Sequence, residues 1–223
     1  MERISNDPDA DASRMFMIGN VSKEAERLVK VTKEAMYEGM KAIKPWKSHI
    51  GDIGAAIQRY AHINGYSVVE EFCGHGIGMT MHEDPYVFHF KPHEDTVLIV
   101  PGMVFTIEPM LNQGKRNVHL NFNDDWTVYT DDGLLSAQWE HTFLVTEDGV
   151  EIIATIVCDR KSQKGIIVGK QGAMIKKIRL NAQREMKRFL QVPVHLELFV
   201  KVENNWRNKQ KYLKEFGYNE DDY

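Results

Sequence analysis

The most informative part of this 223-residue chain is the stretch Glu70–Pro85, which reads Glu-Glu-Phe-Cys-Gly-His-Gly-Ile-Gly-Met-Thr-Met-His-Glu-Asp-Pro. It contains two histidines, His75 and His82, with glycines alternating around the first of them. Glycine adopts backbone conformations that are closed to other residues, so we expect these glycines to let His75 be aimed freely. An isolated histidine is more often structural than functional, but the glycines and the second histidine favour a functional site.

Two glutamates further along the chain, Glu108 and Glu140, each interrupt an apolar run of the kind that forms β-strands. A buried carboxylate without a partner is costly, so it has to be neutralised by protonation, a cation or a metal. Either glutamate alone could simply point from a half-buried strand into solvent. Together with His75 and Asp11, however, they supply three oxygen ligands and one nitrogen. This set predicts a site for a divalent ion such as Co, Mn, Fe or Zn.

The same region contains five short segments that agree with one family pattern: Cys73–Gly78, His82–Pro85, Phe105–Met110, Asp125–Thr127 and Leu135–His141. They resemble the type I methionine aminopeptidases, which have the pita-bread fold, and the match is collinear over roughly residues 10–153. The resemblance implies that the metal ligands are Asp11, His75, Glu108 and Glu140. It also implies that His82 contacts the scissile peptide and steadies the tetrahedral intermediate, that Glu108 is the general base, and that Cys73 and Trp126 border the substrate pocket.

Charge divides the chain into two parts. Residues 1–153 hold 13 Lys or Arg and 24 Asp or Glu, a net charge of −11, whereas residues 154–223 hold 15 and 8, a net charge of +7. Such an asymmetry predicts two domains, 1–153 and 154–223, of which the basic one is a candidate for binding nucleic acid. The two cysteines exclude a disulfide framework, and no apolar run reaches the ~20 residues of a membrane span, so we expect a cytoplasmic protein.

Apolar periodicity predicts an α+β architecture for the first domain. A helix is expected from an N-cap at Ser22 until Pro45 stops it, and a second helix is expected from a cap at Asp52. Strands are expected before the glycine segment and around each of the two glutamates. The stretch Tyr86–Asp95 is expected to be a loop with an exposed His89 that has no role.

The basic part contains Gly169-Lys170-Gln171-Gly172 immediately before an amphipathic helix pattern. A lone Gly-x-x-Gly is a weak signal and is usually just a turn. At the start of a helix, with basic residues nearby that include Lys176 and Lys177, it becomes informative because free backbone N–H groups at a helix N-terminus attract anions. A phosphate-binding P-loop would need Gly-Lys followed by Ser or Thr, which this chain lacks.

Three segments of the basic part, Gln163–Ile178, Val194–Val202 and Asn205–Asn208, resemble the C-terminal type II KH domain of the Era-type ribosome-assembly GTPases. The resemblance covers roughly residues 151–218. It implies contact with single-stranded ribosomal RNA, on the ribosome or free, through the Gly169–Gly172 loop and neighbouring lysines. No GTPase domain accompanies it, so we expect no nucleotide hydrolysis.

The chain also departs from both families. The aminopeptidases have a further metal-binding Asp and an N-terminal half, which would fall at or before Met1. The KH part lacks its usual first helix and strand. We therefore expect a truncated pita-bread domain followed by an incomplete KH domain, joined near Asp148–Ile152 as a fusion or an assembly product. We also expect one metal ion at best and impaired catalysis.

Three functions are compatible with these features. The first hypothesis is a metalloaminopeptidase that removes N-terminal methionine from nascent peptides and carries an RNA-binding KH domain. The alternative is an Era-like ribosomal-RNA-binding module attached to an inactive peptidase remnant. A peptidase for proline-containing peptides is a weaker option, because the segment around His82 fits the methionine enzyme better.

Overall fold

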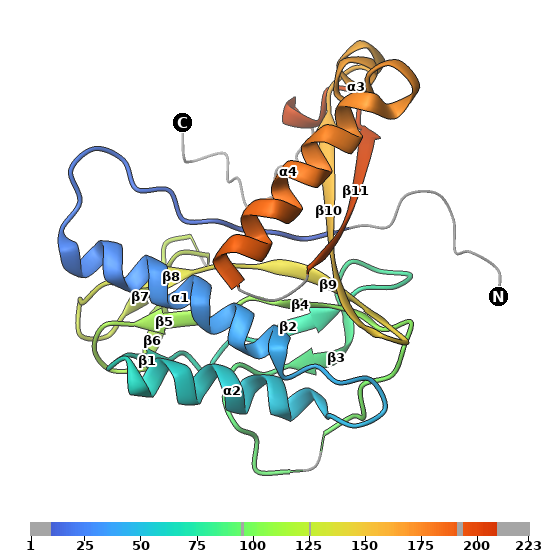
Figure 1. The fold of residues 1–223 in the computed structure, drawn as a ribbon. Coiled ribbons are helices and arrows are strands. Elements are labelled where there is room, and N and C mark those ends of the chain that lie inside the picture. The colour runs from blue at the N-terminus through green and yellow to red at the C-terminus, as the bar shows by residue number, and fades with distance from the viewer. Residues whose placement is uncertain (1–9, 95, 125, 191–193, 209–223) are drawn as a thin grey trace. The chain divides into compact units, whose positions relative to one another are not determined.

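The computed structural model describes residues 10–94, 96–124, 126–190 and 194–208, and the chain divides into two compact units, one ending at Ile153 and one continuing from Ala154 (Figure 1). No helix within these described ranges is long and apolar enough to cross a bilayer.

Two helices of the first unit, α1 (Lys23–Lys41) and α2 (Ile50–Ile63), lie side by side (Figure 1). The predicted N-cap of α1 is confirmed, since the hydroxyl of Ser22 accepts the N–H of Ala25 at 3.1 Å. The predicted cap of α2, Asp52, is wrong by three residues: the N-cap is His49, and the carboxylate of Asp52, inside the first turn, accepts the N–H of His49 at 2.8 Å. The apolar faces of both helices are buried, as the periodicity predicts.

The strands of the first unit form two main sheets and a hairpin. The largest sheet runs β10-β9-β4-β2-β3, the second runs β1-β5-β8, and β6 pairs with β7. Their bounds are β1 Ser67–Val68, β2 Gly74–Gly76, β3 Glu83–Val87, β4 Val104–Ile107, β5 Met110–Asn112, β6 Val118–Leu120, β7 Val128–Thr130, β8 Ser136–Gln138, β9 His141–Thr146 and β10 Gly149–Cys158. The helices pack against both main sheets, and Phe105, Phe143 and Leu111 are fully buried in the core.

The chain passes from one sheet to the other at two adjacent places. Strand β4 continues into β5 through Glu108 and Pro109, and β8 continues into β9 through Trp139 and Glu140. The antiparallel pairings of β4 with β9 and of β5 with β8 bring these two crossings opposite each other. This explains why both glutamates interrupt apolar runs: each lies where the backbone leaves one sheet to enter the next.

The second unit consists of the end of β10, α3 (Lys161–Val168), a short 3-10 turn η1 (Lys170–Gly172), α4 (Ala173–Leu190), β11 (His195–Val202) and a 3-10 turn η2 (Trp206–Asn208). Strand β11 is the neighbour of β10, and the N–H of Glu203 donates to the carbonyl of Cys158 at 2.9 Å. The sequence predicts only a short connecting element at 161–168, and the structure has a helix there. The amphipathic helix after Gly172 and the strand predicted by the apolar alternation of residues 194–202 are present as α4 and β11. Trp206, Leu213 and Phe216 predict a further helix, which lies largely outside the described residues.

Candidate metal centre

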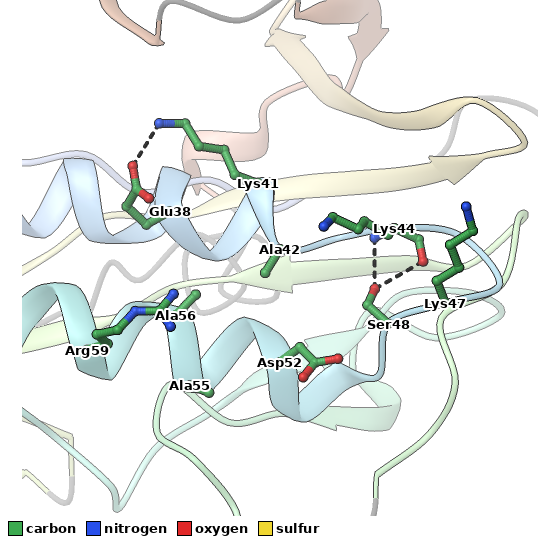
Figure 2. Close-up of a pocket in the computed structure, with 10 residues that line it drawn as sticks. All are labelled: Glu38, Lys41, Ala42, Lys44, Lys47, Ser48, Asp52, Ala55, Ala56 and Arg59. Carbon is green, nitrogen blue, oxygen red and sulfur yellow. Dashed lines mark hydrogen bonds and ion pairs between the residues drawn. The ribbon is translucent and has the colours of Figure 1, made fainter.

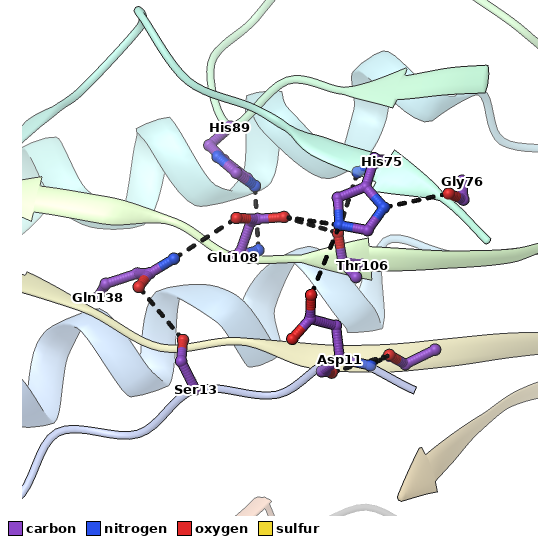
Figure 3. Close-up of polar contacts among 9 residues, drawn as sticks. Asp11, Ser13, His75, Gly76, His89, Thr106, Glu108 and Gln138 are labelled. Carbon is purple, nitrogen blue, oxygen red and sulfur yellow. Dashed lines mark hydrogen bonds and ion pairs between the residues drawn. The ribbon is translucent and has the colours of Figure 1, made fainter. Parts of the chain in front are cut away.

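His75 is the buried centre of β2 and points one ring nitrogen at two carboxylates (Figure 3). Its Nδ1 lies 3.1 Å from the carbonyl oxygen of Gly76. This oxygen accepts a hydrogen bond from the Nδ1–H group, so the neutral ring has its lone pair on Nε2. Nε2 lies 3.7 Å from Glu108 Oε1 and 4.0 Å from Asp11 Oδ2. Burial lowers the pKa of His75, so the ring is held in the neutral form that binds metals.

The glycines beside His75 are required for a different reason from the one predicted. Neither Gly74 nor Gly76 has a positive φ. Instead, a Cβ at Gly76 would lie 2.2 Å from the carbonyl oxygen of Asp84 on β3, and a Cβ at Gly74 would lie 2.5 Å from that of Thr106 on β4. The glycines therefore allow three strands to approach closely around His75, and the expectation of special backbone conformations is wrong for these two.

Glu108 is held from several sides (Figure 3). The hydroxyl of Thr106 donates to Glu108 Oε1 at 2.8 Å, and the side-chain amide of Gln138 donates to Oε2 at 3.5 Å. Gln138 is in turn held by the hydroxyl of Ser13 at 3.2 Å. These contacts come from β4, β8 and the segment before α1, so they fix the carboxylate at the crossing between the sheets.

Asp11 belongs to the segment that precedes α1 and reaches the cluster by lying along β9. Its N–H donates to Thr142 Oγ1 at 2.8 Å, and the same hydroxyl donates to its carbonyl oxygen at 2.8 Å. Two residues later, Ser13 accepts the N–H of Glu140 at 3.1 Å. The segment is thus tied both to β9 and to Glu140, the predicted ligand that comes immediately before this strand.

The pKa values of all three carboxyl groups are raised. Burial is the main cause for Asp11, Glu108 and Glu140, and the charges of the neighbouring carboxylates add to it for the two glutamates. Such a cluster is unfavourable in its ionised form unless a cation is present. The ligand atoms of His75, Glu108 and Glu140 lie within 4.8 Å of one another, as do those of Asp11, His75 and His82. This donor set fits a borderline divalent ion.

The other residues predicted for the site have different surroundings. His82 is exposed, and its ring centroid lies 4.1 Å from that of His75. Cys73 is half-buried, and burial followed by the charge of Glu108 raises its pKa. Trp126 is 55% exposed in the β6–β7 hairpin, where its main-chain N–H donates to the carboxylate of Asp124. The pocket roles of Cys73 and Trp126 stay predictions.

One residue of the site was assigned wrongly from the sequence. His89, expected to be exposed and without a role, is 2% exposed, and its Nε2 accepts the main-chain N–H of Glu108 at 3.1 Å. Burial lowers the pKa of His89 to about 3, so the ring stays neutral and can accept this bond. Val87, Phe88 and Phe90 make an apolar run around His89 in the sequence, and this is the signal that could have indicated a buried histidine.

The loop predicted to bind RNA connects α3 with α4. Three of its four residues have positive φ: 70° at Gly169, 53° at Gln171 and 78° at Gly172. Lys170 and Gln171 are exposed, as are Lys176 and Lys177 on the first turn of α4. The loop therefore presents exposed basic and polar groups at a helix N-terminus, the arrangement that suits a phosphate backbone.

The α+β fold with a buried carboxylate–histidine cluster at the crossings between its sheets defines the first unit as a pita-bread domain of the metallopeptidase class. Metallopeptidase family M24 matches residues 9–147, and the chain belongs to this family. The KH domain family matches residues 140–207. The two matches overlap on β9, so this strand is shared by both patterns.

Several methionine aminopeptidases are similar to this chain. That of Salmonella typhimurium is 49% identical over 150 residues, covering 67% of this chain and 56% of the relative, and that of Escherichia coli K12 is 47% identical over 143 residues, covering 64% and 53%. The crystal structure of the Rickettsia prowazekii enzyme is 44% identical with a TM-score of 0.62, covering 64% of this chain and 57% of that one. The Thermotoga maritima structure has a TM-score of 0.61 at 36% identity over the same shares. The chain spans about half the length of the curated relatives it matches.

Proposed function

We propose that the first unit is a metal-dependent aminopeptidase that removes N-terminal methionine from peptides. The observation that carries the proposal is that His75 belongs to two groups of close ligand atoms, one with Glu108 and Glu140 and one with Asp11 and His82. All three carboxyl groups have raised pKa values. The relatives at 47–49% identity that bear the name methionine aminopeptidase support the choice of substrate. Since Asp11, Glu108 and Glu140 each lie in a group that contains His75, we expect a single divalent ion.

Each residue of the cluster has a distinct task in this proposal. A bound divalent ion supplies Lewis acidity toward the substrate carbonyl. Glu108 accepts the proton of the attacking water. Thr106 and Gln138 hold its carboxylate in place for this role. His82, exposed beside His75, donates a hydrogen bond to the carbonyl oxygen as negative charge develops on it. Cys73 and Trp126 are proposed to contact the methionine side chain.

The test measures hydrolysis of a Met-initiated tripeptide by the full chain after chelation and after addition of Mn or Co. Hydrolysis is expected only with metal. Glu108→Gln keeps the shape of the side chain but removes the proton acceptor, so it should lower the rate by roughly 10²–10⁴-fold. A control variant, Glu24→Gln on the exposed start of α1, should retain the wild-type rate. Equal rates for wild type and Glu108→Gln would refute the enzyme and leave a peptidase-like remnant.

For the second unit, we propose an Era-type KH domain that contacts single-stranded ribosomal RNA in the cytoplasm. The KH match and the exposed Gly169–Gly172 loop support RNA as the ligand, while the sequence pattern of Gln163–Ile178 supports the Era type. Both cysteines are free thiols, as suits a reducing compartment.

The proposal is tested by replacing two residues of the Gly169–Gly172 loop with aspartate. Lys170→Asp combined with Gln171→Asp should weaken RNA binding by at least tenfold, because the loop would then repel phosphates. Gln171 has a positive φ, which Asp tolerates. The matched control, Lys161→Asp with Ser162→Asp, makes the same charge change at the exposed opposite end of α3. If both pairs weaken binding equally, the loop is not the contact surface.

A further inference from the structure

A second concave site lies between α1, the turn that follows it and α2, and none of its lining residues belongs to the metal cluster (Figure 2). The cavity has a volume of about 490 Å³ and is open to solvent. Its wall includes the small side chains of Ala42, Ala55 and Ala56, which leave the space between the two helices unfilled. The charged side chains around it are Glu38, Lys41, Lys44, Lys47, Asp52 and Arg59.

Both acids of this cavity are already engaged. Glu38 forms an ion pair with Lys41 at 2.7 Å, and the carboxylate of Asp52 accepts the N–H of His49 at the start of α2. Throughout the described part of the chain, no carboxylate forms an ion pair with Lys44, Lys47 or Arg59. Three exposed cations therefore surround one hollow. This is unexpected in residues 1–153, whose net charge is −11.

The backbone that carries two of these cations is held in place. The hydroxyl of Ser48, itself buried, accepts the N–H of Lys44 at 2.8 Å and donates to the carbonyl oxygen of the same residue at 3.1 Å (Figure 2). The N–H of Trp46 donates to the carbonyl of Ile99 at 2.8 Å. Lys44 and Lys47 thus extend from a fixed turn, whereas Arg59 extends from α2, which packs into the core and forms another part of the lining.

We propose that this hollow, called here the α1–α2 pocket, binds a phosphate group. A multiply charged tetrahedral anion matches one guanidinium fork and two ammonium groups, which would form charge-assisted hydrogen bonds with it from two walls. A pocket of this volume also accommodates the group to which the phosphate is attached. The phosphate can come from a small phosphorylated compound or from the backbone of an RNA bound by the same chain. This proposal does not depend on the peptidase activity.

The first experiment measures binding of inorganic pyrophosphate to the full chain by calorimetry. The triple variant Lys44→Gln, Lys47→Gln and Arg59→Gln should weaken binding by roughly tenfold or more, because it removes all three unpaired cations. The matched control, Lys23→Gln, Lys30→Gln and Lys91→Gln, removes the same charge from exposed positions outside the pocket. Equal weakening by both triples, or by neither, overturns the proposal.

The second experiment distinguishes the two sources of phosphate with a single-stranded RNA oligonucleotide. It uses the Lys170→Asp, Gln171→Asp background, in which the KH loop no longer contributes. If the RNA backbone is the source, residual binding in this background should disappear with the pocket triple, and the salt dependence should fall by about 0.7 per lost phosphate contact. If pyrophosphate binds in the pocket and this RNA does not, the ligand is a small phosphorylated compound. If the pocket triple affects neither probe, there is no phosphate site.

A third measurement uses the wild-type chain, so it tests the proposal even if the triple variant does not fold. Pyrophosphate should protect Lys44 and Lys47 of the wild-type chain from an amine-reactive reagent. Lys23 and Lys91 are exposed on the same unit and should react at an unchanged rate. Uniform protection, or none at all, contradicts a phosphate site at the α1–α2 pocket.

Discussion

At the scale of single residues, the position of His75 depends on the close approach of the β3 and β4 backbones to the glycines on either side of it. Gly76 is the clearest case, because a Cβ there would meet the main chain of Asp84, which cannot rotate away as a flexible side chain could. We expect Gly76→Ala to force β2 away from β3, to destabilise the chain by about 1–3 kcal/mol and to weaken metal binding. Thermal unfolding and titration with Mn check both effects. Gly165→Ala is the control, since nothing lies within 4 Å of its Cβ position and helix α3 favours alanine.

His89 is expected to act as a positioning residue for Glu108. In His89→Leu the main-chain N–H of Glu108 loses its acceptor, and a buried unpaired donor costs about 1–3 kcal/mol. We expect the affinity for Mn to fall roughly five- to hundredfold, and His89→Gln, whose amide oxygen can accept the bond, to recover part of it. The exposed His93→Leu is the control. A lower unfolding temperature with unchanged Mn affinity would show that His89 is only a packing residue.

At the scale of elements, the metal cluster depends on the segment before α1 lying along β9. Thr142 makes this connection by accepting from and donating to the main chain of Asp11. Thr142→Val keeps the shape of the side chain but removes both bonds, so we expect weaker binding of Mn. Thr142→Ser keeps the hydroxyl and should retain the affinity. If Thr142→Val binds Mn as tightly as Thr142→Ser does, Asp11 is either held by other contacts or is not a ligand.

The elements also show which features a sequence can predict. Helix caps and strand alternation are local, so Ser22 at the start of α1 and the strand His195–Val202 were predicted. The order of strands is set by pairing between distant segments, and the crossings at Glu108 and Glu140 become visible only when β4 pairs with β9 and β5 with β8. For the same reason the partner of His89 was missed: it lies 19 positions away in the sequence.

At the scale of the whole molecule, the two units bring different chemistry into one chain. The first has a large excess of acids and gathers three of them around His75, while the second is basic and exposes lysines at a helix N-terminus. If the α1–α2 pocket binds RNA phosphate, the acidic first unit would contact the same RNA that is proposed to bind to the basic second unit. The two proposed activities, peptide processing and RNA binding, would then share a ligand, and the salt dependence of RNA binding would report on both units.

The carboxylate cluster predicts how the stability of the whole chain responds to pH and metal. In the metal-free protein, burial and neighbouring charges raise the pKa of Glu108 to about 7 and that of Glu140 to about 9, from an ordinary value of 4.5. The folded state therefore holds more protons than the unfolded state between about pH 4.5 and 9, so these groups make the free energy of unfolding fall as pH rises through this window. A divalent ion replaces the protons and binds more tightly at higher pH, adding about 2.7 kcal/mol at a concentration 100-fold above its dissociation constant. The unfolding temperature with Mn minus that with chelator should therefore increase from pH 5.5 to pH 8.5, and Glu140→Gln should reduce this increase. A difference that does not change with pH in the wild type would mean that the carboxylates do not exchange protons for a metal.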